Sequence, residues 1–490
     1  MNIIHGDCLE ELKKLEDNSI DAVVTDPPYG LSNTKPQQVA DVLKAWVTGD
    51  TASVPAKRGG FMGKDWDSFV PPPAVWEECM RVLKPGGHMA VFAGARTQDL
   101  MGLSIRLAGF EIRDTLGWVY GSGFPKSHDI GKAIDKRGGN AHLAKEIGKA
   151  IREARESRGL TKGDCDERFC GGTTNWSWFE GRPAGIRPPS VEVFSAIANE
   201  WPELGVYAEK VAEVEREVVG KYQSGLHTGP SGVGGHGEGG AVTAPATSEA
   251  QRWDGWGTAL KPAIEPIILA RKPLDGTVAN NVLAHGVGGL NIDACRVPTD
   301  EIRVQGSQAS TGATPFGGAR EGGKVYDKGR FPANVLLDEH AAKEMDKQSG
   351  VVPSGGRTSA RNSPKFSKGV YGEWSGAEEK TYAPDSGGAS RYFPVFKYQA
   401  KAPKKERPVI EREDGTKIQH PTVKPLTLLE WLVELITPPN GVVLDPFAGS
   451  GTTLQAAINK GFTPIGIEQD ADYIKLIEKR LEATCTTHKN

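Results

Sequence analysis

The sequence predicts an α/β protein, and three observations support this class. Residues 1–120 and 420–490 alternate short apolar runs with stretches that carry apolar residues at helical spacing. The apolar runs end at turns that contain Gly or Pro, as buried strands commonly do. Gly accounts for 61 of the 490 residues, nearly double its usual share of about 7%. This excess predicts long loops and insertions and argues against a compact all-helical protein.

The N-terminal residues 1–135 predict one half of an α/β core. A strand at 20–25 stops at a Pro-Pro loop formed by residues 26–30. Apolar residues at helical spacing predict a helix at 73–82, which the sequence Lys84-Pro85-Gly86-Gly87 ends. Further strands are expected at 88–93 and 115–120.

The C-terminal residues 406–490 predict the other half of the core. Before this half, a separate core segment at 255–275 contains a strand at 263–270 that returns to the core. The expected elements after it are a helix at 426–436, a strand at 442–444, a Gly-rich turn, a helix from Thr452, a strand at 464–467 and a helix at 472–481.

Three segments between these halves differ in composition. Residues 141–208 place Ile147, Ile151 and Ala154 on one helical face and predict a small helical insertion. Residues 209–254, which are rich in Gly, Ser, Thr and Ala, predict a flexible linker. Residues 276–405 are polar and Gly-rich and predict a loop-rich region.

Composition excludes several classes of protein. No run approaches the roughly 18 apolar residues of a membrane span, and the first residues do not form a signal peptide. Six scattered Cys do not make a disulfide framework, and Cys165 and Cys170 stand too far apart for a CxxC zinc pair. These features fit a reducing cytoplasm and predict no metal. The formal charge of −3 neither indicates nor excludes nucleic-acid binding, because local patches decide it.

The first candidate site is the Gly-rich turn from Asp445 to Thr453. It follows a strand and opens a helix, so its glycines permit close backbone approach and the helix offers free N–H groups. Glu468 ends the next strand, where an acid can accept hydrogen bonds from two ribose hydroxyls. The alternative is a structural turn with a surface acid.

The second candidate site is the sequence Thr25-Asp26-Pro27-Pro28-Tyr29-Gly30, a Pro-Pro loop at the end of a strand. Two prolines fix its backbone, so Asp26 presents a fixed acceptor and Tyr29 a fixed aromatic face. That pair suits a planar base with an exocyclic amine. Asp26 would accept hydrogen bonds from the amine while the ring of the base stacks on Tyr29. A tight turn after a strand is the alternative.

Together the two sites resemble the DNA amino-methyltransferases, which use S-adenosylmethionine. In that family a D/N/S-P-P-Y loop holds the target amine and an F-x-G-x-G turn, here Phe447 to Gly451, holds the methyl donor. The loop precedes the turn here, which is the order of the family's β group. The resemblance implies a Rossmann-like mixed sheet between helices that ends in an antiparallel hairpin. It assigns residues 1–135 as the catalytic half and 276–405 as the target-recognition region.

Further segments carry the resemblance. The sequence His5-Gly6-Asp7-Cys8 is similar to the family segment whose acid contacts the cofactor adenine, and residues 420–425 to the segment near the methionine moiety. Residues 81–87 are similar to the family's helix-to-strand element. The implied catalytic residues are Asp26, Pro27, Pro28 and Tyr29, and the implied cofactor-binding residues are Asp7, Lys424, Asp445, Phe447, Gly449, Gly451, Thr452 and Glu468.

The chemistry of an exocyclic amine explains the loop. The amine lone pair is delocalised into the ring, and acceptors at Asp26 and the Pro27 carbonyl would favour a more tetrahedral nitrogen. A duplex hides this atom, so the base must flip out. Trp118, Tyr120 or Phe124 would form the second wall of the base pocket, although core packing explains Trp118 equally well.

The sequence favours methylation of adenine N6 in double-stranded DNA, because Asp at position 26 leans towards adenine and a Ser there would lean towards cytosine. Three alternatives stay open: cytosine N4 methylation, methylation of a protein or RNA amine, and a regulator that binds without catalysis. A DNA methyltransferase would act in the cytoplasm of a bacterial or phage-infected cell. A cognate restriction endonuclease would then be a candidate partner.

The insertion resembles the Cro-type repressor helix-turn-helix. Residues 173–179 match the recognition helix, so Thr174, Asn175 and Ser177 would read base edges. Arg182 and Arg187 would contact phosphates. The many Asp and Glu residues of the segment instead favour a structural or partner-binding insertion.

Residues 300–410 carry basic residues interleaved with Tyr and Phe, a composition that suits a DNA backbone. The alternative is a solvated charged face. The basic residues are Arg320, Lys324, Arg330, Arg357, Arg361, Lys365, Lys368 and Arg391.

Overall fold

The computed structural model divides the chain into two compact units, which are described separately. The sheet unit comprises Met1–Gly123 and Ala263–Asn490, and the helical unit comprises Phe124–Pro262. The structure describes residues 2–32, 34–55, 67–121, 123, 127–137, 140–172, 175–181, 189–214, 218–221, 241–243, 248–299, 303–305, 324–326, 329–354, 385–396, 407–412 and 414–487.

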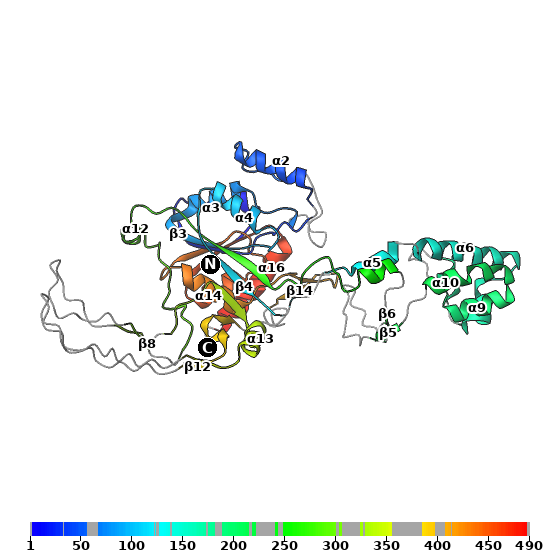
Figure 1. Ribbon diagram of the computed structural model, residues 1–490. Coiled ribbons are helices and arrows are strands. Elements are labelled where there is room, and N and C mark those ends of the chain that lie inside the picture. Colours follow the sequence, from blue (N-terminus) through cyan, green and yellow to red (C-terminus); the bar gives the residue numbers. More distant parts are fainter. Residues whose placement is uncertain are drawn as a thin grey trace. The chain divides into compact units, whose positions relative to one another are not determined.

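A mixed sheet of nine strands, counted over the described residues, forms the centre of the sheet unit (Figure 1). Its order is β1 (Asn2–His5), β17 (Thr463–Glu468), β16 (Val442–Asp445), β2 (Ile20–Thr25), β3 (Leu83–Phe92), β7 (Ile264–Arg271), β4 (Glu111–Val119), β10 (Val335–Asp338) and β13 (Val395–Phe396). Only β7 runs antiparallel to its neighbours. The carboxyl ends of the other eight strands therefore lie at one edge of the sheet, together with the start of β7.

Helices cover both faces of this sheet, which is why its central strands are almost continuously apolar. Val23 and Met89 point to the face covered by α3 (Pro73–Val82) and α4 (Gln98–Leu107), while Val24 and Ala90 point to the face covered by α14 (Leu426–Ile436). Figure 1 shows α3 and α4 on the opposite side of the sheet from α14. This arrangement confirms the α/β, Rossmann-like class.

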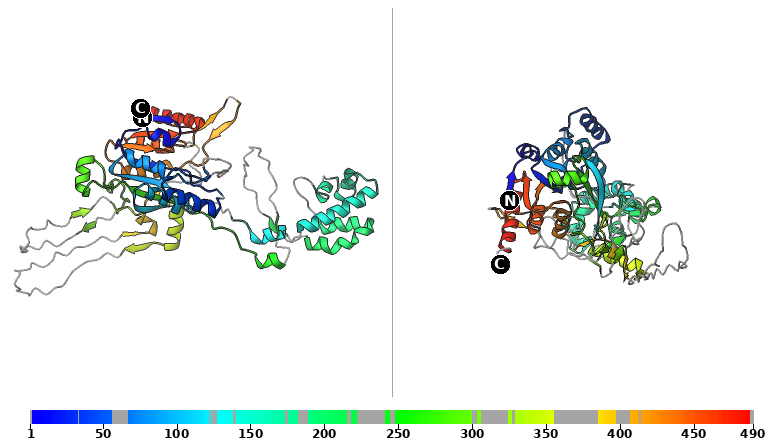
Figure 2. Two further views of the ribbon diagram at one scale, coloured as in Figure 1. Left: turned by 90° about the horizontal axis from the view of Figure 1, so that it is seen from above. Right: turned by 90° about the vertical axis from the view of Figure 1, so that its left-hand side faces the viewer.

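The sheet unit contains further described elements outside the nine-stranded sheet. They are α1 (Cys8–Leu12), α2 (Pro36–Val47), α12 (Val278–His285), α13 (Glu339–Ser349), α15 (Thr452–Asn459), α16 (Ala471–Thr487), the 3-10 helix η4 (Ala389–Tyr392), and the hairpins β8 (Arg303–Gln305) with β9 (Lys324–Tyr326), β11 (Val352–Ser354) with β12 (Asp385–Gly387), and β14 (Val409–Glu411) with β15 (Lys417–Gln419). Figure 2 shows the β14–β15 hairpin beside α16, where Lys479 donates a hydrogen bond to the Val409 carbonyl.

The expected strands and helices of both halves are present, with bounds that differ by a few residues. The helices at 73–82 and 426–436 have the predicted bounds, whereas β3 begins at Leu83 and includes the Pro-Gly-Gly sequence expected to end helix α3. Within the described part of residues 276–405, β10 and β13 join the main sheet beyond β4. The antiparallel pair β4–β7 therefore lies inside the sheet and not at its end.

The helical unit has an apolar core of its own. Ile147 and Ile151 are fully buried with Trp176 and Trp201, as the helical spacing of residues 141–208 predicts. Its described elements are α5 (Ile130–Arg137), α6 (Asn140–Ser157), α7 (Lys162–Cys170), α8 (Trp176–Phe179), α9 (Val191–Glu200), the 3-10 helix η3 (Pro202–Tyr207), α10 (Ala208–Val214), α11 (Ser248–Arg252), and the hairpin β5 (Val218–Lys221) with β6 (Ala241–Thr243).

The buried carboxylate of Glu180 joins three parts of this helical core. It accepts hydrogen bonds from Arg155 at 2.5 Å and from the Trp176 indole at 2.8 Å, and it lies 3.2 Å from the Lys162 ammonium. Burial opposes ionisation of Glu180, but these donors outweigh it and hold the pKa below its usual value.

The prediction that a linker begins at residue 209 is wrong. Helix α10 occupies Ala208–Val214 and buries Val211 against the core of the helical unit, so the helical unit extends past residue 208. Among the described residues, no helix is both long and apolar enough to cross a membrane.

Candidate active site

The two candidate sites meet at one edge of the sheet, although about 420 residues separate them. The Asp26 loop follows β2, and the Gly-rich turn follows β16, which is the parallel neighbour of β2. Thr25, the last residue of β2, donates a hydrogen bond of 2.7 Å to Asp445, the last residue of β16. The carboxyl ends of parallel strands in an open α/β sheet form a binding crevice, and both predicted motifs lie there.

The Asp26 loop is fixed by contacts as well as by its prolines. Pro27 is buried. The Thr97 hydroxyl donates a hydrogen bond of 2.6 Å to the Tyr29 carbonyl, and the Gly30 N–H donates one of 2.9 Å to Asp67. Gly30 has φ +65°, and a Cβ there would lie 2.7 Å from the Val70 nitrogen, so only glycine fits this turn.

Both carboxylate oxygens of Asp26 accept hydrogen bonds from side chains. The Tyr29 hydroxyl donates to Oδ1 at 2.9 Å, and the Lys424 ammonium donates to Oδ2 at 2.6 Å. Glu265, near the start of β7, completes the cluster: its Oε2 accepts from the Tyr29 hydroxyl at 3.3 Å and lies 3.4 Å from Lys424 Nζ. We call these four residues the Asp26 cluster.

The charges of the Asp26 cluster stabilise one protonation state for two of its members. Burial opposes the charge on Lys424, but the carboxylates of Asp26 and Glu265 outweigh it and raise the pKa of Lys424 above its ordinary value. Burial and the same two carboxylates raise the pKa of Tyr29 well above its ordinary value. Lys424 is therefore a permanent cation, and Tyr29 a neutral hydroxyl, at physiological pH.

The Gly-rich turn is shaped from inside the protein. Asp445 is 2% exposed and accepts from Thr25 and from the Phe447 N–H at 3.1 Å, so it shapes the turn and does not present a carboxylate to a ligand. Burial raises the pKa of Asp445 to about 6. Thr452 is 6% exposed with its hydroxyl 3.2 Å from that of Ser450, which leaves its backbone as the part that could contact a ligand.

Both glycines of the turn have left-handed backbones, with φ +53° at Gly449 and φ +76° at Gly451. A Cβ at Gly449 would lie 3.0 Å from His420 Nε2, and one at Gly451 would lie 3.0 Å from the Ile477 side chain in α16. The space beside Gly451 is thus filled by protein. Close approach to a ligand is not the reason for glycine at 451, which corrects the expectation drawn from the sequence.

Glu468 ends β17 next to the turn. Its Oε2 accepts from the Gly449 N–H at 2.8 Å, and its Oε1 accepts from the Asp470 N–H at 2.9 Å. Each oxygen keeps a second lone pair that could accept from a ribose hydroxyl. Burial raises the pKa of Glu468 to about 7, although the two N–H groups act in the opposite direction.

Asp7 lies after β1, the strand next to β17, and is exposed. One of its oxygens caps α1 by accepting from the N–H groups of Leu9 and Glu10, so the other is open to a ligand. Phe447 packs against Trp76 with ring centroids 6.2 Å apart. The turn, Glu468 and Asp7 thus form a row along one sheet edge that could hold a cofactor containing a nucleoside.

Sequence reasoning missed Glu265, and it placed Thr25 in the second candidate site without assigning it a role. An acid before an apolar run looks like a strand boundary, and only the antiparallel direction of β7 brings Glu265 to the edge that holds Asp26. Thr25 reads as part of a buried strand. Its hydroxyl group, directly before the Asp26 loop, is the feature of the sequence that could have indicated a role at the site.

The structure corrects the expectation for Trp118. Its indole is 2% exposed and packs 5.9 Å from Phe396 of β13, so it is a core residue and no wall of a base pocket. Phe124 lies outside the described residues. Arg330 is 5% exposed and donates to the Arg391 carbonyl, and Arg391 in turn donates to the carbonyls of Gly387 and Gly388. These two arginines join neighbouring loop segments through backbone carbonyls.

The stretch expected to be a recognition helix contains only a single helical turn, α8, in its described part. Trp176 and Phe179 of α8 point into the helical core, while Asn175 is exposed before it. Thr174, Arg182 and Arg187 lie outside the described residues, as do Arg320, Arg357, Arg361, Lys365 and Lys368.

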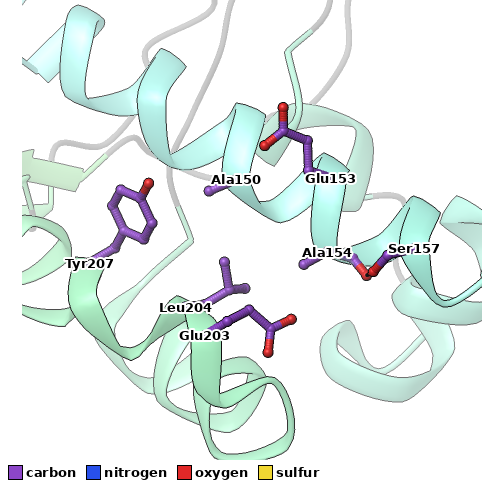
Figure 3. A pocket seen from close by; sticks show the side chains of 7 residues that line it. All are labelled: Ala150, Glu153, Ala154, Ser157, Glu203, Leu204 and Tyr207. Carbon is purple, nitrogen blue, oxygen red and sulfur yellow. Dashed lines mark hydrogen bonds between the residues drawn. The ribbon is translucent and has the colours of Figure 1, made fainter.

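An open depression lies on the helical unit between α6 and η3 (Figure 3). Ala150 of α6 and Leu204 of η3 face each other across it, and Glu153 and Glu203 are also among its lining residues. Two carboxylates in the lining are unsuited to a phosphate, and we assign this depression no ligand. The remaining lining residues are Ala154, Ser157 and Tyr207.

The fold and the site define a class: an α/β protein whose Gly-rich turn and Asp26 loop follow adjacent parallel strands at one edge of the sheet. The chain belongs to the DNA methylase family of N6 and N4 methyltransferases, because the family model matches residues 20–141 and 296–479. The matched segments contain the Asp26 loop, Lys424 and the Gly-rich turn.

Curated relatives match over shorter stretches. The putative methylase YubD of Escherichia coli K12 is 52% identical over 64 residues, which are 13% of this chain and 28% of the relative. The Type II methyltransferase M.HinfI of Haemophilus influenzae is 48% identical over 77 residues, 16% of this chain and 21% of the relative. The E. coli K12 DNA adenine methyltransferase YhdJ is 48% identical over 63 residues, 13% and 21%. The chain thus spans about a quarter of the length of the curated relatives that it matches.

Solved structures align along most of the chain at low similarity. A putative DNA modification methylase of Thermus thermophilus, complexed with S-adenosyl-L-methionine, is 14% identical with a TM-score of 0.33 over 99% of this chain and 96% of that one. The cytosine-N4-specific PvuII DNA methyltransferase is 12% identical with a TM-score of 0.35 over 98% and 85%. The fold assignment therefore depends on the sheet described above.

Proposed function

We propose that this protein is a site-specific DNA methyltransferase that transfers a methyl group from S-adenosylmethionine to the N6 amine of a flipped adenine. One observation carries the proposal: the Asp26 loop and the Gly-rich turn follow adjacent parallel strands, and the Thr25–Asp445 hydrogen bond of 2.7 Å joins those strands. The proposed amine acceptor and the proposed cofactor turn are thus neighbours. Membership of the DNA methylase family supports the same reaction.

The residues along the sheet edge fit the cofactor by their chemistry. Glu468 retains acceptor capacity for a ribose diol, and Asp7 keeps one oxygen for the adenine amine. The backbone at Gly449 and the start of α15 offers N–H groups to the rest of the molecule. Bound here, S-adenosylmethionine would supply a methyl group on a sulfonium, whose C–S electron pair would stay with sulfur as the methyl group is transferred to nitrogen.

The Asp26 loop orients the amine. A carboxylate oxygen of Asp26 and the Pro27 carbonyl accept its two N–H groups, which directs the nitrogen lone pair out of the ring plane. The base stacks on the half-buried Tyr29 ring. No strong base is required, because the amine loses its proton only after it has become cationic.

Adenine is the proposed base because Asp occupies position 26 and because a DNA adenine methyltransferase, YhdJ, is among the relatives matched. Double-stranded DNA is the proposed partner. The helical unit is proposed to make a second contact with DNA through Asn175, Arg182 and Arg187. Since several relatives are named Type II methyltransferases, we also propose a cognate restriction endonuclease as a partner of this protein. The proposed location is the cytoplasm of a bacterial or phage-infected cell.

Sequencing that detects modified bases, applied to DNA from cells that express the protein, tests this proposal. The expected result is N6-methyladenine at one short sequence, and none with Asp26→Ala. If nucleoside mass spectra instead show N4-methylcytosine, the target base is cytosine and not adenine. Unmodified DNA from cells that contain folded protein would refute the proposed activity.

A further inference from the structure

The Lys424 ammonium is the centre of the Asp26 cluster. It donates to Asp26 Oδ2 at 2.6 Å and lies 3.4 Å from Glu265 Oε2. It also lies 5.2 Å from the Tyr29 ring centroid and 5.0 Å from that of Phe92. With its side chain 12% exposed, Lys424 has two carboxylates within reach and little contact with water.

This arrangement conflicts with the proposed reaction if it stays unchanged. The target amine must donate to Asp26, and its nitrogen gains positive charge as the methyl group arrives. A permanent cation hydrogen-bonded to the same carboxylate weakens that carboxylate as an acceptor and repels the developing charge. Lys424 must therefore shift away from Asp26, and the nearest described alternative partner is Glu265.

Glu265 is placed to receive it. The two carboxylates flank Lys424 Nζ, at 2.6 Å and 3.4 Å, and the Tyr29 hydroxyl contacts both of them at 2.9 Å and 3.3 Å. A small movement of the flexible Lys424 side chain would bring its ammonium to Glu265 and away from Asp26. The buried ammonium would keep an anionic partner throughout, which avoids the cost of an unpaired buried charge.

We propose that Lys424 is a positioning residue that exchanges partners, holding Asp26 in the empty site and moving to Glu265 when the target amine binds Asp26. This inference rests on the proposed function. The methylated nitrogen then gives its extra proton to Asp26. Asp26 passes that proton to water, and Lys424 returns to Asp26.

The test uses the full-length protein and the variants Glu265→Gln, Lys424→Met and the double variant. Tritiated S-adenosylmethionine at saturating concentration and genomic DNA from a bacterial strain without DNA methyltransferases serve as substrates in single-turnover assays. Calorimetry measures cofactor affinity separately. Glu111→Gln is the matched control, because Glu111 makes a comparable 2.6 Å pair with Arg271 away from the site.

In Glu265→Gln, Lys424 has Asp26 as its remaining anionic partner and stays there. We expect the methyl-transfer rate to fall about tenfold or more with cofactor affinity within twofold of wild type. Removing Lys424 as well frees Asp26, so the double variant should be several-fold faster than Glu265→Gln. Glu111→Gln should remain within twofold of wild type.

A second readout does not depend on activity. In the ligand-free protein, urea midpoints of Asp26→Asn, Lys424→Met and their combination should show non-additive losses, because the two residues are paired. Lys424→Gln replaces Lys424→Met where the latter does not fold.

A double variant as slow as Glu265→Gln, wild-type rates in Glu265→Gln, or additive urea midpoints would overturn the partner exchange. No methyl incorporation by the wild-type protein would refute the proposed function itself, which is a distinct result.

Discussion

Thr25 and Asp445 join the two halves of the site, with the Thr25 hydroxyl donating to Asp445 Oδ1 at 2.7 Å inside the protein. Thr25→Val keeps the shape and removes this donor, so a buried carboxylate loses one of its partners. We expect a loss of about 1–3 kcal/mol in the free energy of unfolding. Urea unfolding checks it, with Thr115→Val, an exposed β4 residue, as the control that should change little. Equal effects of the two substitutions would contradict this role of Thr25.

Asp26→Ala should abolish methyl transfer, because the amine loses its acceptor. Lys424 retains Glu265 at 3.4 Å, so the variant should fold. Cofactor affinity should be largely intact, since the Gly-rich turn follows another strand. Tritium transfer to DNA and calorimetry measure the two properties, and transfer near the wild-type rate would exclude Asp26 from the reaction.

Cofactor affinity should increase with pH through the pKa of Glu468, which burial raises to about 7. Ribose hydroxyls donate best to the ionised carboxylate, so affinity should rise about tenfold between pH 6 and pH 8 if only that form binds. Glu468→Gln cannot ionise and should give a flat profile. Calorimetry at several pH values checks this, and parallel profiles for the two proteins would exclude Glu468 as the titrating group.

The same shift predicts a stability change in the ligand-free protein. A carboxyl group whose pKa is higher in the folded state stabilises that state below its unfolded value, 4.5, and this contribution is lost as pH rises through about 7. Compared with Glu468→Gln, the wild-type protein should therefore become less stable between pH 4.5 and about 8. Urea midpoints of both proteins across this range measure the difference, which should decrease steadily.

Gly451→Val should destabilise the fold and affect the cofactor only as a consequence. Its backbone has φ +76°, and the new side chain would press on Ile477. Gly461 has φ +78° with nothing within 4 Å of its Cβ position, so Gly461→Val isolates the backbone strain of about 1–3 kcal/mol. The 451 variant should lose about 1–3 kcal/mol more from overpacking. Equal losses would mean that Ile477 yields freely.

Replacing residues 140–214 by a short Gly/Ser linker should leave cofactor binding intact, because the Gly-rich turn, Glu468 and Asp7 all belong to the sheet unit. The deletion includes α10, since otherwise Val211 would be exposed. If the helical unit contacts DNA, anisotropy on duplexes should show weaker binding and a shallower salt dependence. Unchanged DNA binding would leave a structural or partner-binding role. Loss of cofactor binding in a folded deletion protein would refute the independence of the two units.

The sequence predicts much of this molecule because its strongest signals are local. The apolar run before Asp26 and the helix at 426–436 are visible within a few residues. What is missed depends on packing at long range. The direction of β7 places Glu265, the burial of Asp445 and Trp118 removes both from the surface, and β10 and β13 lie in a Gly-rich region where short strands leave a weak pattern.

The adjacency of β2 and β16 also constrains how the chain acquires its structure. Val23 pairs with Leu444, so the central strand pair forms only after about 420 intervening residues have been synthesised. At roughly 5–20 residues per second, a ribosome would expose the unpaired edge of β2 for about 20–80 s. Such a delay favours capture by molecular chaperones during translation. It also means that N-terminal fragments ending before β16 should aggregate on release.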